Sequence, residues 1–203
     1  MQKGYQVIAL EPAHRIYEQL SNNFAGNPAV TTLKLAVSDI DDSIVNFYEA
    51  DEDGLSTLNK DWLTKESLPY AGKNFRTINA RTITIDTLAK RYGEPDLIKI
   101  DVEGAEWFVF RGMTRKYGVL TFEWTIQTID EHNEQLKYLK SLGYQEFAPQ
   151  FIEHHLQEPD KWYSLDNFNL DVWVQENKEQ WETNDWKKSN LRPTADVGMC
   201  WVR

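Results

Sequence analysis

The chain has 203 residues, of which 41% are hydrophobic, so it is long enough to bury the core of one domain and too apolar for global disorder. Its net charge of -10 and its pI of about 4.9 exclude a generally basic surface of the kind that binds nucleic acid, and leave room only for a local basic patch. No run of about 18 apolar residues is present, which predicts no membrane span. The single cysteine, Cys200, excludes an intramolecular disulfide, fits a reducing cytoplasmic compartment and is expected to be a buried, inert thiol.

Strand and helix signals alternate along the chain. The expected strands cover 5–10, 31–37, 43–48, 76–85, 96–102, 119–124 and a segment that starts at 144–147. The expected helices cover 13–24, 86–91, about 103–111 and 129–142. The strand over 96–102 is the clearest buried one, whereas 49–74 reads as an acidic, polar segment. This alternation predicts one α/β domain over 1–203 with a mostly parallel sheet covered on both faces.

The last quarter of the chain is rich in tryptophan and harder to interpret. Residues 170–174 and 197–202 are both strand-like, and the two could form an antiparallel hairpin at the edge of the sheet. Four tryptophans in this region either line a pocket for a substrate or pack the hairpin: Trp162, Trp173, Trp181 and Trp186.

Glu11 ends the first expected strand, in the segment Val7-Ile-Ala-Leu-Glu-Pro12. In doubly wound sheets ligands bind at the carboxyl ends of strands, where a carboxylate commonly accepts hydrogen bonds from ribose hydroxyls. Two acceptor oxygens suit the vicinal diol of a ribose. Glu11 is therefore a candidate nucleotide ligand, and the alternative is a turn residue or a solvated one.

Lys99, Asp101 and Glu103 alternate along the strand over 96–102 and its exit, so in an extended chain they would share one face. A charged side chain buried in an apolar strand is costly unless it is paired. We therefore expect Lys99 to reach a carboxylate or a cofactor. A functional role and a purely structural pair of Lys99 with Asp101 or Glu123 both remain open on spacing alone.

Two residues shape the exit from this strand. Gly104 would let the backbone turn sharply into the following helix. Glu106 would fall in the first turn of that helix, where a carboxylate interacts favourably with the helix dipole. We expect Asp101 to lie nearer to any chemistry than Glu106.

Glu123 ends the next strand and should lie beside Asp101 if the two strands are neighbours. Adjacent carboxylates can act as a general base, hold a divalent metal or form a satisfied polar rim. His154 and His155, which follow Glu153, would point apart on a strand, so we expect no metal ion to be shared there.

Several segments resemble, in order, the motifs of FkbM-type methyltransferases. They are Val7-Ile-Ala-Leu-Glu-Pro12, Leu20-x-Asn22-Asn23, Ala36-Val-Ser-Asp39, Thr84-Ile-Asp-Thr-Leu88, Asp96-Leu-Ile-Lys-Ile-Asp-Val-Glu-Gly-Ala-Glu106 and Phe122-Glu-Trp124. The resemblance covers about Gly4 to Trp124, and its most specific part runs from Lys99 to Glu106. It fades beyond about Gln150, which leaves 4–150 as the core of the domain and 151–203 as a divergent part.

The resemblance implies a Rossmann-like class I methyltransferase fold with the strand order 3-2-1-4-5-7-6. Strand 7 is antiparallel, so the mostly parallel sheet has an antiparallel C-terminal edge. It implies S-adenosylmethionine as the methyl donor and a hydroxyl of a sugar or other small metabolite as the acceptor. The charge and the hydropathy of the chain predict neither nucleic acid nor a membrane as a partner. In the family's roles Glu11 would hold the cofactor ribose, and Ala36 and Ser38 would lie near the adenine.

The same resemblance implies that Asp101 and Glu103 flank the methyl group and the acceptor, with Glu123 and Lys99 nearby. One of the carboxylates would deprotonate or orient the acceptor hydroxyl.

The chain departs from the family pattern at its start. The family begins with a strand and a glycine-rich turn of the type Asp-x-Gly-Ala-Asn-x-Gly, whereas six residues precede Val7 and the ten glycines include no such cluster. The first strand, which would lie between the strands ending at Glu11 and Asp101, is thus expected to be missing. We expect a fragment or a mis-started gene product, and the alternative is a fold that closes over the gap. A degenerate binding or scaffold domain is the alternative to an enzyme.

Overall fold

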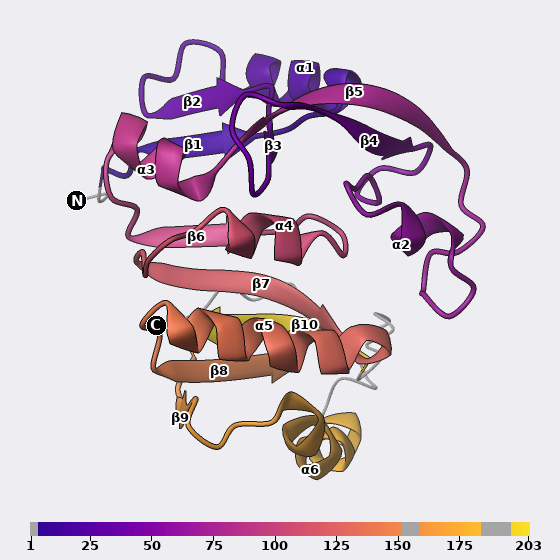
Figure 1. The fold of residues 1–203 in the computed structure, drawn as a ribbon, viewed down its shortest axis with the longest axis vertical. Helices are drawn as coiled ribbons and strands as arrows, with labels where there is room; N and C mark the ends of the chain where they lie inside the picture. Colours follow the sequence, from indigo (N-terminus) through magenta and orange to yellow (C-terminus); the bar gives the residue numbers. More distant parts are fainter. Residues whose placement is uncertain (1–3, 152–158, 184–195) are drawn as a thin grey trace. The chain divides into compact units, whose positions relative to one another are not determined.

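The computed structural model describes residues 4–151, 159–183 and 196–203. The chain folds into two compact units. The first comprises Met1–Glu66, Tyr70–Glu94 and Val102–Thr114, and the second comprises Ser67–Pro69, Pro95–Asp101 and Arg115–Arg203. Each unit is an assembly of strands and helices (Figure 1).

The first unit contains two small sheets. One is a parallel pair, and the other has the order β3-β5-β4, with β3 parallel and β4 antiparallel to β5. The strands are β1 (Val7–Leu10), β2 (Val30–Leu33), β3 (Ala36–Val37), β4 (Ile44–Ala50) and β5 (Phe75–Ile83). The helices are α1 (His14–Asn23), α2 (Lys60–Thr64), α3 (Ile85–Tyr92) and α4 (Glu106–Arg111).

The strand expected over 31–37 is divided between these two sheets. Its first part, β2, pairs with β1, whereas Ala36 and Val37 pair with Thr82 and Ile83 of β5. The expectation of one continuous strand is therefore wrong, because the chain leaves one hydrogen-bonding partner and takes up another. Small side chains allow close packing beneath β3: Ala36 forms a core cluster with Ala13, Phe47 and Ala80.

Gly112 ends α4, and its backbone is not left-handed, since its φ is -79°. A Cβ atom at this position would lie 2.3 Å from the carbonyl oxygen of Ser38. Glycine is thus required here by the close approach of two backbone segments of the first unit rather than by a turn.

The second unit is built on one five-stranded sheet with the order β6-β7-β10-β8-β9. β6 is parallel to β7, and β10 is antiparallel to both β7 and β8. The strands are β6 (Leu97–Ile100), β7 (Val119–Thr125), β8 (Glu146–Phe151), β9 (Tyr163–Ser164) and β10 (Val197–Val202). The helices are the short 3₁₀ helix η1 (Ile126–Thr128), α5 (Ile129–Ser141) and α6 (Leu170–Thr183).

The C-terminal part of the chain differs from its expected hairpin. Residues 170–174 begin α6, where Leu170 and Val174 are both buried and Val172 is 49% exposed, a helical rather than an alternating pattern. β10 is a strand, as expected, but it lies between β7 and β8 and not at an edge. Its almost fully buried apolar run suits this interior place.

β6 is less buried than its apolar sequence predicts. It is an edge strand of its sheet, where Leu97 is 50% exposed and Lys99 is also exposed, so its description as the clearest buried strand is wrong. β7 is the better example, with Leu120, Phe122 and Trp124 all at 0% exposure. α5 packs on this face of β7, where the rings of His132 and Phe122 lie 6.4 Å apart.

The remaining expectations for the fold concern the single cysteine, the C-terminal tryptophans and membrane spans. Cys200 is buried, as expected. Trp173 stacks on Phe151 at 4.7 Å and meets Trp124 edge-on at 6.4 Å, so it packs within the second unit. Trp186 and the side chain of Trp181 lie outside the described residues. No helix of the described chain is both long enough and apolar enough to span a membrane.

Candidate active site

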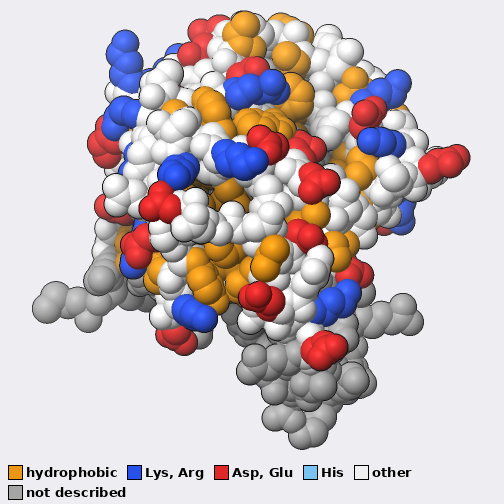
Figure 2. Space-filling model, turned by 60° about the horizontal axis from the view of Figure 1, so that its bottom comes forward, with side chains coloured by type: hydrophobic (Ala, Val, Ile, Leu, Met, Phe, Trp, Pro, Cys, Tyr) orange, Lys and Arg blue, Asp and Glu red, His pale blue; other side chains and the backbone are white. Residues whose placement is uncertain are grey.

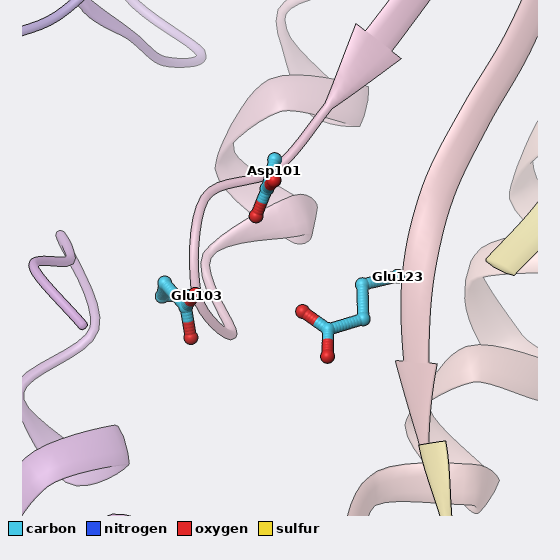
Figure 3. A group of neighbouring side chains, drawn as sticks. All are labelled: Asp101, Glu103 and Glu123. Carbon is cyan, nitrogen blue, oxygen red and sulfur yellow. The ribbon is translucent and has the colours of Figure 1, made fainter. Parts of the chain in front are cut away.

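Asp101 and Glu123 come together at the carboxyl end of the parallel pair β6 and β7. The ladder pairs Lys99 with Thr121 and Ile100 with Phe122, so the next position brings Asp101 opposite Glu123. A carboxylate oxygen of each lies within 4.8 Å of the other (Figure 3). The expectation that Glu123 lies beside Asp101 is thus confirmed, because parallel neighbours end at the same edge of a sheet.

Lys99 pairs with Asp101. Its Nζ lies 2.5 Å from Asp101 Oδ2, and the two side chains are 39% and 37% exposed. Lys99 therefore reaches a carboxylate, one of the two expected partners. We expected Lys99 to be buried, but it is exposed because β6 is an edge strand. An ion pair this exposed contributes only about 0–1 kcal/mol to stability. The contribution of this ion pair to stability is therefore too small to explain by itself why an aspartate occupies this position.

Glu103 lies in the sharp turn that follows. Its φ is 54°, in the left-handed region that few residues other than glycine adopt, and the φ of Gly104 is 75°. Gly104 makes the expected turn, but the turn begins one residue earlier. Two residues of chain span at most about 7 Å, so the connection itself keeps Glu103 near Asp101. Figure 3 shows these two side chains and that of Glu123.

The turn is held by α2, in the segment that the sequence presents as polar and acidic. The indole Nε1 of Trp62 donates to Glu103 Oε2 at 3.2 Å, and Asn59 Nδ2 donates to the carbonyl of Gly104 at 2.9 Å. Sequence reasoning missed both residues. The sequence does contain a signal for a short helix here: Asn59 is a typical N-cap residue, and the apolar pair Trp62 and Leu63 follows it.

Glu106 lies in the first turn of α4, as expected. It is only 4% exposed, and its Oε1 accepts a hydrogen bond from the backbone N–H of Gly104 at 3.3 Å. Its carboxylate thus closes the turn from the helix side in addition to interacting with the helix dipole.

Glu11 directly follows β1 in the first unit. Its Oε1 accepts a hydrogen bond from the N–H of Ala13 at 2.7 Å. Burial raises the pKa of Glu11, the Ala13 hydrogen bond opposes this rise, and the nearby Glu49 carboxylate adds to it. Glu49, which sequence reasoning did not single out, is 5% exposed and lies 2.6 Å from Arg76 Nε. A second carboxylate thus influences the charge of Glu11.

Ala36 and Ser38 lie in and just after β3. Ala36 is 3% exposed, and its side chain belongs to the core of the first unit. Ser38 is equally buried, its N–H donates to Ile83 at 3.0 Å, and its Oγ donates to Asp39 Oδ1 at 3.1 Å. Both side chains are used in internal packing. Their contact with an adenine stays a prediction.

The remaining candidates concern metals and surface charge. Glu153, His154 and His155 lie outside the described residues. On the face drawn in Figure 2, side chains of Lys and Arg are interspersed with those of Asp and Glu and with apolar ones.

The comparisons with known proteins gave one match. A family model described as "Methyltransferase FkbM domain" matches residues 1–167. The match extends beyond Gln150, where the resemblance in the sequence fades. No curated protein and no solved structure matches the chain.

Proposed function

Because the chain belongs to the FkbM methyltransferase domain family, we propose that it serves S-adenosylmethionine-dependent methyl transfer to a hydroxyl of a sugar or another small metabolite. The observation that supports this role is the carboxylate pair of Asp101 and Glu123 at the ends of two adjacent parallel strands. Ligands of open α/β sheets bind at such strand ends.

The strand order supports a Rossmann-like fold. The order β6-β7-β10-β8, with β10 antiparallel, corresponds to 4-5-7-6 in the expected arrangement, and the parallel pair of β1 and β2 corresponds to 2 and 3. Within the described residues β1 has a ladder only with β2, and β6 only with β7.

Glu11 fits the ribose of the proposed cofactor. One of its oxygens is anchored by the N–H of Ala13, and a carboxylate offers a second oxygen that can accept a hydrogen bond from a ribose hydroxyl. Ala36 and Ser38 fit the adenine less well, since the Ala36 side chain lies in the core and the Ser38 hydroxyl bonds to Asp39. S-adenosylmethionine, when bound, supplies an electrophilic methyl group.

The carboxylates supply the acid–base chemistry. In the proposed reaction the acceptor hydroxyl would lose its proton to Asp101 or Glu123 as its oxygen bonds to the methyl group and the bond from that methyl group to the cofactor sulfur breaks, which would leave a neutral thioether. Lys99 Nζ lies 2.5 Å from Asp101 Oδ2, and this ion pair orients the Asp101 carboxylate. Glu103 follows in the next turn, where the indole N–H of Trp62 donates a hydrogen bond to its Oε2.

Substitution of the pair tests the proposal. Asp101→Asn and Glu123→Gln keep the shape of each side chain and remove its charge. We expect substitution of the carboxylate that acts as the base to lower turnover by about 100-fold and to leave the affinity for S-adenosylmethionine unchanged. The assay follows transfer of a labelled methyl group to a panel of monosaccharides and methyl glycosides, and calorimetry measures cofactor affinity. Asp130→Asn, an exposed site in α5, serves as the control.

Full activity in both variants would remove the pair from the mechanism. Cofactor binding by the wild type without transfer to any acceptor would favour a binding domain instead. Loss of folding in Asp101→Asn alone would mean that Asp101 mainly neutralises Lys99.

A further inference from the structure

The turn at Glu103 and Gly104 is under conformational strain at Glu103. Both residues have left-handed backbones, with φ of 54° and 75°. A residue other than glycine persists in this region only where its surroundings hold it there, and such residues cluster at functional sites. The contacts that hold this turn therefore bear on what Glu103 does.

Trp62 contacts the turn through both its polar atom and its ring. Its indole N–H donates to Glu103 Oε2 at 3.2 Å. Its ring lies against Gly104 so closely that a Cβ atom on Gly104 would be 2.4 Å from Trp62 Cε3. Trp62 is itself 3% exposed and meets the ring of Tyr70 at 5.6 Å, so it has little freedom to move. One rigid side chain thus fixes a carboxylate oxygen and the backbone beside it.

Asn59 joins the same turn to the start of α2. Its Oδ1 caps the helix by accepting from the N–H of Asp61 at 3.2 Å, and its Nδ2 donates to the carbonyl of Gly104 at 2.9 Å. The N–H of Asn59 in turn donates to Thr57 Oγ1 at 2.9 Å. Thr57 exchanges two backbone hydrogen bonds with Tyr48 of β4. The turn is therefore connected to the sheet of the first unit through the start of α2.

We propose that Trp62 and Asn59 are positioning residues that orient the carboxylate of Glu103 for the reaction at this site. The inference rests on the proposed function, for which the resemblance to the family implies that Glu103 flanks the methyl group and the acceptor. A glutamate side chain has several rotatable bonds, and a misplacement of about 1 Å in a reacting group can lower a rate about 100-fold. A hydrogen bond from a buried indole removes most of that freedom from one carboxylate oxygen.

The hydrogen bond itself can be tested without any activity. In ¹H–¹⁵N spectra the Trp62 indole signal is identified by its loss in Trp62→Phe. We expect this signal to shift and its N–H to exchange faster in Glu103→Ala, and to stay unchanged in Glu66→Ala, a change at an exposed residue of the same unit. An indole signal that is insensitive to Glu103→Ala would overturn the proposal.

The consequence is tested by kinetics. Trp62→Phe removes the indole N–H and keeps an aromatic ring, while Asn59→Asp keeps the cap of α2 and removes the donor to Gly104. We expect either change to lower kcat at least about tenfold, with the affinity for S-adenosylmethionine and the KM of the acceptor within about twofold of wild type.

Leu63→Val is the matched control, because Leu63 is 1% exposed in the same helix and makes no contact that the argument uses. An equal loss of kcat in Leu63→Val would mean that α2 acts only through stability, and would overturn the positioning role. If Trp62→Phe fails to fold, Asn59→Asp decides the kinetic question. A wild type without methyl transfer would refute the proposed function, while the indole signal would still decide whether α2 holds Glu103.

Discussion

His132 of α5 is a buried histidine whose hydrogen bonds require the neutral form. It is 3% exposed. Its Nε2 accepts a hydrogen bond from the backbone N–H of Thr125 at 3.2 Å, so Nδ1 carries the proton and donates to Gln135 Oε1 at 2.9 Å. The hydroxyl of Thr128 also lies 3.0 Å from Nε2. Protonation of Nε2 would break the bond to Thr125, two residues after Glu123.

Burial lowers the pKa of His132 from 6.5 to about 4, although the Gln135 hydrogen bond opposes this shift. The unfolded chain therefore binds a proton below about pH 6.5, while the folded protein does not do so until about pH 4. The stability that comes from this difference is fully present above pH 6.5 and is lost as the pH falls towards 4. The loss is about 2 kcal/mol at pH 5 and about 3 kcal/mol in full, from about 1.4 kcal/mol per pH unit.

Denaturant unfolding of wild type and His132→Gln, measured between pH 7.5 and 5, isolates this effect. All other groups titrate in both proteins, so the difference between their free energies of unfolding reports His132. We expect that difference to fall by about 2 kcal/mol over this range. The same comparison with His14→Gln should stay within about 0.5 kcal/mol, because the His14 side chain is 63% exposed. A constant difference for His132→Gln would refute the reasoning from burial.

Three further changes test other parts of the structure. Glu11→Ala should weaken the binding of S-adenosylmethionine by about 1.5–3 kcal/mol in calorimetric titration, the usual cost of losing a charged hydrogen-bond partner; unchanged affinity would separate Glu11 from the cofactor. Glu106→Gln should cost up to about 1 kcal/mol of stability in denaturant unfolding and leave turnover unchanged, and a large loss of turnover would contradict its structural role. Gly198→Ala places a Cβ atom 2.0 Å from the carbonyl oxygen of Gln150 and should cost at least about 2 kcal/mol of stability, whereas Gly4→Ala, with nothing within 4 Å, should cost almost none.

Local patterns in the sequence were sufficient for much of the strand and helix succession. Apolar runs predicted β1, β7 and β10, and the helix signal over 13–24 predicted α1, because these signals depend on residues close together in the chain. The carboxylate pair of Asp101 and Glu123 could also be predicted. It needs only two buried-type strands that follow each other in an α/β chain and so become parallel neighbours.

The partners of some strands could not be predicted from local patterns in the sequence. Nothing local distinguishes a continuous strand over 31–37 from two short strands that bond to different neighbours, β1 and β5. In the same way, the apolar run at Leu170 suits a strand or a buried helix face equally well. Its helical state and the interior place of β10 depend on hydrogen bonds and packing between segments far apart in the chain.

At the candidate site the sequence alone determined which residues carry charge, and the tertiary structure decided what holds them. The motif around Asp101, Glu103 and Gly104 is readable in the sequence because its residues are contiguous. In the sequence, Trp62 and Asn59 are 41 and 45 residues away from their partners Glu103 and Gly104. They lie in the segment whose sequence is acidic and polar. A hydrogen bond from a side chain leaves no periodic trace in the sequence, since its geometry arises only when the chain has folded α2 against the turn.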